Sequence, residues 1–457
     1  MIDIAAQVLD LVKSESPAAE AEVTVDNTEL ALTRFANSFI HQNVAEATTA
    51  VRLRLHADGR TATGSTTIVD TQGLRGLVER TVAAARLCPP DPQWPGLAPA
   101  APTSPLPQID DETAHADPAA RAARVRDFIT AADGLEAAGY CSTIRLATAF
   151  ANSAGMAADA VSALAAMDAI ARAGHADGVS RLASSRLSDL DGGQLGARAA
   201  TKARASLQPQ ELAAGRYEVV LEPAAVFDLL QNLSFYAFNG KAVNERRSFI
   251  EVGEAQFDPA LSIVDDPFDP AGFGVAFDAE GTPKARRMFV DAGLSAAVAH
   301  DRRSAGQAKT VSTGHALPGA AAFGAIATNL HLVPTGHGPA PVEVDGPAAD
   351  SSVAALVGHV SRGLLVSDFW YTRVLDPRTL VITGLTRNGV WLIEDGVVTQ
   401  PVQNLRFTQS YPQAMAPGGV LGVGSHSVGL PSGWDALAYR APALRLASWN
   451  FTGNASG

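Results

Sequence analysis

The sequence predicts an α+β protein: an N-terminal antiparallel sheet with covering helices, followed by a β-rich C-terminal domain with one buried helix. Three observations lead to this prediction. The 457 residues exceed what one hydrophobic core usually organises, so two domains of roughly 200 residues are expected. Apolar and polar residues alternate over residues 21–67, which is typical of strands. Beyond residue 210 the chain consists of short β-rich runs separated by Gly, Pro and Asp turns.

The predicted domain boundary follows a change of composition at residues 208–215. We expect an N-terminal domain over residues 1–210 and a C-terminal domain over residues 211–457. Eight of the nineteen residues from 89 to 107 are proline. Because proline lacks a backbone N–H and fixes φ, this segment is predicted to be an extended surface connector within the N-terminal domain.

The first residues predict an amphipathic helix, because apolar side chains recur at Ile4, Val8, Leu11 and Val12. This pattern differs from that of a secretory leader, which has a charged start, an apolar stretch and a small-residue cleavage site. No stretch approaches 18 continuous apolar residues, so a membrane-spanning helix is not expected. The sequence therefore predicts a cytoplasmic protein.

The next elements alternate between strands and helices. Residues 21–67 predict an antiparallel meander, and Asp-Asn, Asn-Ser and Asp-Gly pairs predict breaks at 26–27, 37–38 and 58–59. Helices are predicted from Asp70, from Asp117-Pro118 towards residue 135, and from about 192 to 207. A strand is expected over 140–151. The alanine-rich segment 156–173 fits either a helix or a strand.

The C-terminal domain is predicted to be mostly β, with one exception after its first strand. That strand, YEVVLEP, is followed by AAVFDLLQNLSFYAF, in which Val226, Leu229, Leu230 and Leu233 have helical spacing. We expect one buried helix there.

Charge and composition exclude several classes of function. The net charge of −12 leaves no excess of Lys and Arg, and no basic block is present, so direct nucleic-acid binding is not expected. The two cysteines, Cys88 and Cys141, provide neither a disulfide framework nor a CxxC metal motif. None of the ten histidines forms an HExxH pair, and the six-residue spacing of His331 and His337 matches no metal geometry.

The acidic and basic pairs of the sequence are most simply turns. Asp110-Asp111 and Asp265-Asp266 lie in loop-like sequence, and Glu245-Arg246-Arg247 has the composition of a polar turn. A guanidinium pair could hold a substrate carboxylate, but charge runs usually face solvent. The residues alone therefore indicate a two-domain soluble protein without a recognisable catalytic constellation.

Several segments nevertheless resemble the TldD/PmbA family, which is related to zinc metallopeptidases and also named "modulator of DNA gyrase". They are RFANSFIHQNVAEATTAVRLRLHADGRTATGS, RYEVVLEPAAVFDLL and, most specifically, GLLVSDFWYTRVLDPRTLVITGLTRNGVWLIEDGVVTQPVQNLRF. The closing APALRLASWNFTG is similar to the ending of the PmbA (TldE) branch. An acidic chain offers no obvious DNA surface, so any link to gyrase would be indirect.

The resemblance also implies what this chain lacks. In the catalytic TldD branch the helix after the VVL-x-P strand carries HExxxH, and a cysteine near the C-terminus completes a zinc site. Aligned through the shared Leu-Leu pair, Gln231 and Asn232 take the places of the first His and the Glu, and Tyr236 that of the second His. No cysteine follows Cys141. Amides and phenols are poor zinc ligands, so no cofactor, metal site or catalytic residue is expected in this chain.

The family resemblance implies a non-catalytic, TldE-like subunit of a zinc metallopeptidase complex. A TldD-like partner would carry the zinc, and both subunits would enclose unfolded peptides held by main-chain hydrogen bonds to β-rich walls. The residues expected to line that space are Gln231, Asn232, Tyr236 and Asn239, whose alternative role is ordinary packing. The chain would then be a metallopeptidase homologue that is inactive alone.

Two other functions remain open from the sequence. The chain could be a standalone homodimer that binds peptides or proteins without cleaving them, and would then need no TldD-like subunit. It could also be a hydrolase with an unrelated site made of Asp and His residues in the C-terminal loops. That hydrolase would act as a pure protein in the presence of a strong chelator.

Overall fold

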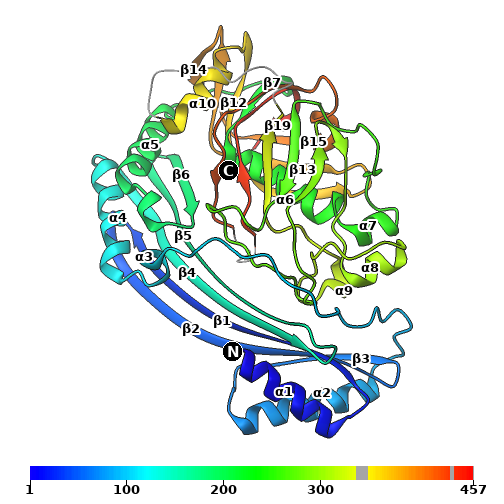
Figure 1. Ribbon diagram of the computed structural model, residues 1–457. Coiled ribbons are helices and arrows are strands. Elements are labelled where there is room, and N and C mark those ends of the chain that lie inside the picture. Colours follow the sequence, from blue (N-terminus) through cyan, green and yellow to red (C-terminus); the bar gives the residue numbers. More distant parts are fainter. Residues whose placement is uncertain (336–347, 433–436, 456–457) are drawn as a thin grey trace.

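The computed structural model describes residues 1–335, 348–432 and 437–455, which form three β-sheets with surrounding helices. We call residues up to 210 the N-terminal half and residues from 211 onward the C-terminal half. In Figure 1 the long N-terminal sheet curves around the C-terminal half, which lies on its concave side. This arrangement confirms the predicted α+β class.

The N-terminal sheet is antiparallel throughout, with strand order β3-β2-β1-β4-β5-β6. Its strands are β1 (Glu20–Ala36), β2 (Phe39–Ala57), β3 (Arg60–Thr66), β4 (Glu136–Asn152), β5 (Ala157–Ala173) and β6 (Ala176–Ser184). Four of them have 17 to 19 residues, which is long for strands of a globular protein. The sheet thus supplies one continuous concave wall.

The turns of the meander were predicted correctly at two of three places. Asn37 and Asp58 have φ angles of 50°, the left-handed conformation that Asn and Asp tolerate in tight turns. The predicted break at Asp26-Asn27 is wrong, because β1 continues through it. There the Asp26 carboxylate pairs with Arg52, and the Asn27 amide donates to the Thr49 hydroxyl. These cross-strand contacts offset the low strand propensity of Asp and Asn.

The ambiguous alanine-rich segment is strand β5. It pairs with β4 on one side and with β6 on the other, so its backbone hydrogen bonds are satisfied within the sheet. Small side chains also allow a helix to approach this part of the sheet. A Cβ atom added at Gly178 would lie 2.1 Å from the carbonyl oxygen of Ala199 in the covering helix.

Helices cover the other face of the N-terminal sheet (Figure 1). They are α1 (Ile2–Glu15), α2 (Thr71–Leu87), α3 (Asp111–Ala114), α4 (Pro118–Ala131) and α5 (Gly192–Ala205), with the 3₁₀ turn η1 (Leu187–Asp189) before α5. The predicted N-caps are confirmed, because the carboxylates of Asp70 and Asp117 accept hydrogen bonds from the N–H groups of Gly73 and Ala120. No helix in the described part of the chain is long and apolar enough to span a membrane.

The C-terminal half contains two sheets. The first has the order β10-β9-β8-β11-β18-β17, and the second contains β12-β7-β19-β15-β13-β14, with β16 paired to β19. Because β12 pairs with both β7 and β13, strands β12, β7, β19, β15 and β13 form a closed ring. The strands are β7 (Gly215–Leu221), β8 (Leu261–Asp265), β9 (Arg287–Asp291), β10 (Leu294–Ser295), β11 (Leu330–Pro334), β12 (Arg362–Asp376), β13 (Val381–Glu394), β14 (Val397–Pro401), β15 (Leu405–Ser410), β16 (Val420–Val423), β17 (Val428–Gly429), β18 (Arg440–Ala441) and β19 (Leu444–Asn454).

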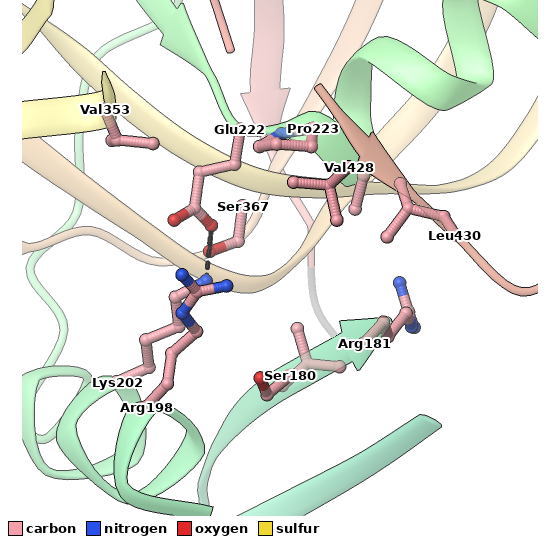
Figure 2. Close-up of a pocket in the computed structure, with 12 residues that line it drawn as sticks. Ser180, Arg181, Arg198, Lys202, Glu222, Pro223, Val353, Ser367, Val428 and Leu430 are labelled. Atoms are coloured by element: carbon pink, nitrogen blue, oxygen red, sulfur yellow. Dashed lines mark hydrogen bonds and ion pairs between the residues drawn. The ribbon is translucent and has the colours of Figure 1, made fainter. Parts of the chain in front are cut away.

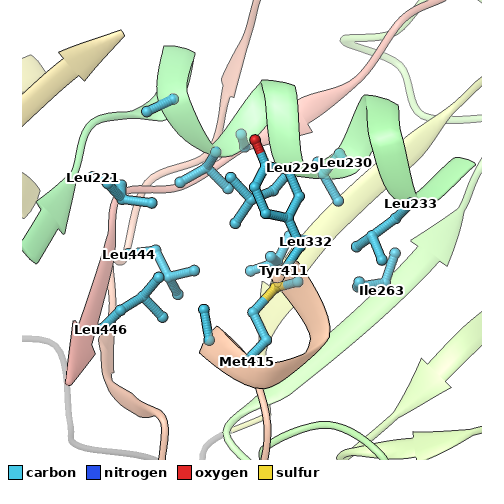
Figure 3. Close-up of a cluster of buried hydrophobic side chains, with 14 of the residues drawn as sticks. Leu221, Leu229, Leu230, Leu233, Ile263, Leu332, Tyr411, Met415, Leu444 and Leu446 are labelled. Atoms are coloured by element: carbon cyan, nitrogen blue, oxygen red, sulfur yellow. The ribbon is translucent and has the colours of Figure 1, made fainter. Parts of the chain in front are cut away.

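The predicted buried helix is α6 (Pro223–Asn232), which continues into the π-helical turn η2 (Leu233–Ala237). Its apolar face packs on side chains from both C-terminal sheets (Figure 3). Short helices that the sequence did not predict join the remaining strands. They are α7 (Gly240–Asn244), α8 (Arg302–Gln307), α9 (Ala320–Phe323), α10 (Ala348–Val357) and α11 (Tyr411–Ala414).

Candidate functional site

Helix α6 carries the positions that the family resemblance assigns to a zinc motif. Pro223 stands in its first turn, where proline is tolerated because the N–H has no partner within the helix. Leu229 and Leu230 are completely buried and point into the cluster drawn in Figure 3. Burial of this face fixes the rotation of the helix, and therefore the directions of Gln231 and Asn232.

The residues at the motif positions are held by local contacts. The Asn232 amide donates to the carbonyl oxygen of Asp228 at 2.9 Å and to its Oδ2 at 3.1 Å. Gln231 is half-buried at the end of α6, and Tyr236 lies in η2 with 36% of its surface exposed. This donor set does not fit zinc, because amide and phenol groups bind it weakly and the Asn232 amide already contacts a carboxylate.

Asp228 is the only acidic residue in α6. Burial raises its pKa to about 6, while hydrogen bonds from Tyr411, Thr372 and Asn232 act in the opposite direction. The Tyr411 hydroxyl donates to Oδ2 at 2.6 Å, and the Thr372 hydroxyl donates to Oδ1 at 2.7 Å. The carboxylate therefore connects α6 to α11 and to β12, which is a structural role.

Asn239, the fourth predicted site residue, is the N-cap of α7. Its Oδ1 accepts hydrogen bonds from the N–H groups of Lys241 and Ala242, and its Nδ2 donates to the Phe323 carbonyl at 2.7 Å. Only 2% of its surface is exposed. It holds the α9 segment in place, so any effect on a peptide space would act through that segment. That these four residues line a peptide chamber stays a prediction.

No group of three or more His, Cys, Asp and Glu side chains suited to a metal ion occurs among the residues that the structure describes. His315 is buried, with Nε2 3.2 Å from Asp265 Oδ2 and Nδ1 2.8 Å from the Thr313 hydroxyl. Burial lowers the pKa of His331 and raises that of the Cys141 thiol to about 12. His337 lies outside the described residues.

A groove separates the concave face of the N-terminal sheet from the C-terminal half. It consists of two adjoining cavities of about 530 Å³ and about 340 Å³. Residues that line both cavities are Thr24, Arg52, Ala279, Leu317 and Pro318. These volumes fall in the range of ligand-binding pockets.

Both walls of the groove combine polar and apolar side chains. The sheet contributes hydroxyls such as those of Thr24 and Thr63, and also the apolar side chains of Ile144 and Leu146. The C-terminal half contributes apolar and charged side chains, among them Phe273, Val275, Phe277, Leu317, Asp278, Glu280 and Lys284. Such a space offers both hydrogen-bonding groups and apolar surface to an extended chain.

An ion cluster at one end of the groove joins the two halves. Arg54 of β2 contacts Glu22 Oε1 at 2.6 Å and Glu280 Oε1 at 3.0 Å. Burial raises the pKa of Glu22 to about 7, with a further increase from Glu280, while Arg54 lowers it. Asp278 also has a pKa raised to about 7 by burial and by Glu280. One guanidinium thus holds two carboxylates from different halves.

A second contact between the halves encloses a smaller cavity of about 40 Å³ (Figure 2). Lys202 of α5 pairs with Glu222, which also accepts a hydrogen bond from the Ser367 hydroxyl. Lys202 and Ser367 hold the pKa of the buried Glu222 below its usual range against the cost of burial. The space suffices for a water molecule but not for a peptide.

Neither the groove nor its ion clusters could be predicted from the sequence. The alternation of polar and apolar residues in β1 can be read from the sequence, because Glu22, Thr24 and Asp26 alternate with valines. That pattern predicts a polar face. It does not reveal that the C-terminal half covers this face, because the covering residues lie more than 200 positions away.

Comparison with known proteins gives one family and one fold. The family model described as "PmbA/TldA metallopeptidase C-terminal domain" matches residues 214–453. A search of curated proteins found no match.

Three solved structures share the fold over nearly the whole chain. TldE from Thermococcus kodakarensis has a TM-score of 0.85 and 17% identity, covering 98% of this chain and 100% of that one. A candidate modulator of a DNA gyrase from Thermotoga maritima has a TM-score of 0.82 and 16% identity, with 98% and 99% covered. A candidate modulator of DNA gyrase from Bacteroides thetaiotaomicron has a TM-score of 0.80 and 19% identity, with 99% and 98% covered.

Proposed function

The chain belongs to the PmbA/TldD family of metallopeptidase-related proteins, and on that premise we propose that it is a non-catalytic subunit of a TldD/TldE-type zinc metallopeptidase complex. In this complex a TldD-like partner carries the zinc, and the substrates are unfolded peptides. The expected cytoplasmic location is part of the proposal.

One observation carries the proposal. The helix that would bear the zinc motif is intact and well packed, but its motif positions hold Gln231, Asn232 and Tyr236. Hydrolysis at a zinc site needs imidazole or thiolate ligands and a carboxylate that acts as a base. The Asn232 amide hydrogen-bonds Asp228 and has no basic character. The chain keeps the fold but has no zinc ligands at these positions, which supports a role in forming the complex and binding the peptide.

The groove supports the substrate part of the proposal. An unfolded peptide has free backbone N–H and C=O groups and side chains of mixed polarity. A slot whose walls combine hydroxyls, charged groups and apolar side chains suits such a chain in an extended form. A compact folded substrate would not enter cavities of a few hundred Å³.

Casein cleavage tests the proposal. The purified chain, a TldD-like partner that carries HExxxH, and the two together are each incubated with unfolded casein. We expect cleavage by the mixture, loss of cleavage with a strong chelator, and no cleavage by this chain alone. A partner variant without the glutamate of its motif is the matched control and should abolish turnover.

Two results would contradict the proposal. Cleavage by this chain alone in the presence of chelator would favour a hydrolase with an unrelated site. Peptide binding by the chain alone, combined with no effect on a TldD-like partner, would favour the standalone homodimeric binding protein.

A further inference from the structure

An exposed aromatic face lies on the hairpin of β12 and β13. We define this aromatic face as Trp370, Tyr371, Arg373, Leu375 and Arg387. The exposed fractions of Trp370, Tyr371 and Leu375 are 52%, 63% and 60%. The Arg387 guanidinium lies 4.2 Å from the Trp370 ring centroid, and that of Arg373 lies 4.2 Å from the Tyr371 ring centroid. Clusters of large exposed apolar groups on soluble proteins mark interaction sites more often than single exposed residues do.

A β-bulge creates this face. Trp370 is opposite Leu385, but Arg373 is opposite Thr383, so β12 has one extra residue between these pairs. Tyr371 occupies the bulge with a φ angle of 53°. In a regular strand Trp370 and Tyr371 would point to opposite sides, whereas the bulge turns both outward.

The backbone conformation of Tyr371 has a free-energy cost, and the residue gains little burial in return. An aromatic residue with positive φ is uncommon, because its Cβ approaches the following carbonyl group. The ring is 63% exposed, so it gains little from burial. Strained, exposed residues of this kind are concentrated at functional surfaces.

The inner side of the same hairpin is anchored firmly. Phe369 stacks on Trp449 with ring centroids 5.0 Å apart, and the Thr372 hydroxyl donates to Asp228 on α6. Both anchors lie next to the bulge in sequence. The aromatic face is therefore held in one orientation before any partner arrives, which lowers the entropic cost of association.

The charge of the hairpin differs from that of the chain. Residues 362–394, which are β12, β13 and the turn between them, contain four arginines and three acidic residues, a formal charge of +1 in a chain of −12. Arg373, Arg378 and Arg387 are all exposed. A copy of the same face, related by a twofold axis, would oppose these arginines with arginines. Complementarity therefore favours a different surface that presents carboxylates.

We propose that the aromatic face is a docking surface for a second, different protein subunit, whose contact region is apolar and flanked by carboxylates. Trp, Tyr and Arg are the residues that most often dominate the binding energy of protein interfaces. The inference rests on the proposed function for the identity of that subunit, a TldD-like protein.

Affinity measurements with variants test this surface. The probe is a purified TldD-like subunit. The dissociation constant of its complex with this chain is measured by light scattering or by calorimetric titration. The double variant Trp370→Ser/Tyr371→Ser should weaken binding by about 100-fold or more. Arg373→Glu/Arg387→Glu should also weaken it and reduce its dependence on salt.

Phe39→Ser is the matched control, because Phe39 is another exposed aromatic, 56% exposed, beside the turn between β1 and β2. It should leave the affinity unchanged, and thermal unfolding checks that every variant folds. Equal affinities for wild type and the aromatic variants would overturn the inference. So would a wild-type chain that does not bind the probe, or self-association that depends on Trp370 and Tyr371.

The casein assay separates this inference from the proposed function. A complex that forms through the aromatic face but cleaves nothing would support the docking surface and contradict the peptidase role. An active complex that the double variant does not disturb would support the peptidase role and overturn the docking surface.

Discussion

At the residue scale, the contacts of single side chains explain how the residues at the motif positions of α6 are held. Asn232 hydrogen-bonds Asp228, which also accepts hydrogen bonds from Tyr411 and Thr372. A carboxylate at position 232 would lie against a buried carboxylate. The helix is therefore adapted to its present residues, and Asn232 forms part of its local hydrogen-bond network.

Glu22 gives a prediction about pH at this scale. Its pKa rises from an ordinary value of 4.5 to about 7 in the folded protein, chiefly through burial. The folded state thus keeps a proton that the unfolded state has lost, and the free energy of unfolding should fall as pH rises from about 4.5 to 7. Glu22→Gln should reduce this slope by at most about 1.4 kcal/mol per pH unit.

Urea unfolding at several pH values measures the effect. Asp278 titrates in an overlapping range in both proteins, so the informative quantity is the difference between wild type and variant. Glu46→Gln, on an exposed part of β2, controls for the loss of one carboxylate. Identical slopes for wild type and Glu22→Gln would show that Glu22 ionises normally.

At the element scale, the bulge in β12 links local strain to recognition. Replacing Tyr371 by Gly removes the conflict between Cβ and the backbone at positive φ. We expect the free energy of unfolding to increase by about 1 kcal/mol, while binding of the second subunit weakens. A gain in stability combined with a loss of affinity is the signature of a residue retained for association.

Asn37→Gly is the matched control for this substitution. Asn37 also has positive φ, but asparagine tolerates that conformation, so glycine should change stability by only a few tenths of a kcal/mol. Chemical denaturation measures the free energy of unfolding of the Tyr371→Gly and Asn37→Gly variants. A destabilised Tyr371→Gly variant would mean that the tyrosine ring stabilises the folded chain itself.

Elements with local signals were predictable from the sequence. The caps of α2 and α4 depend on Asp70 and Asp117 and on residues three positions later, so the printed sequence contains the whole signal. The false break at Asp26 arose because its partner Arg52 lies on another strand. The bulge at Tyr371 could not be predicted from neighbouring residues, because it depends on the register between β12 and β13.

Of the candidate site, the sequence predicted the helix but not its surroundings. The apolar spacing of α6 correctly identified Leu229 and Leu230 as buried. The hydrogen bond from Asn239 to Phe323 of α9 could not be foreseen, because the two residues are 84 positions apart. The groove itself requires both halves to be in place.

At the scale of the whole molecule, Arg181 pairs with one carboxylate in its own sheet and with a buried carboxylate of the other half. Arg181 of β6 contacts Asp168 at 2.8 Å and Asp368 of β12 at 2.6 Å. Burial raises the pKa of Asp368, and Arg181 opposes that increase. Arg181→Met would leave a buried carboxylate without its cation, so we expect the free energy of unfolding to fall by roughly 3–5 kcal/mol.

An exposed ion pair in the same sheet provides the comparison. Arg172 and Asp177 contact each other at 2.6 Å near the turn between β5 and β6, and Arg172→Met should cost less than about 1 kcal/mol. Adding Asp368→Asn to Arg181→Met should restore most of the lost stability. If Arg181→Met and Arg172→Met lower the free energy of unfolding by equally small amounts, the Arg181–Asp368 ion pair does not hold the halves together.

The central claim is that this chain shapes a peptidase complex without holding its metal. Elemental analysis of zinc, on the protein purified alone and after co-expression with a TldD-like partner, tests this claim most directly. We predict no stoichiometric zinc in the isolated chain and about one zinc per pair of subunits in the complex. One tightly bound zinc in the isolated chain would contradict the claim and would require ligands other than those at positions 231, 232 and 236.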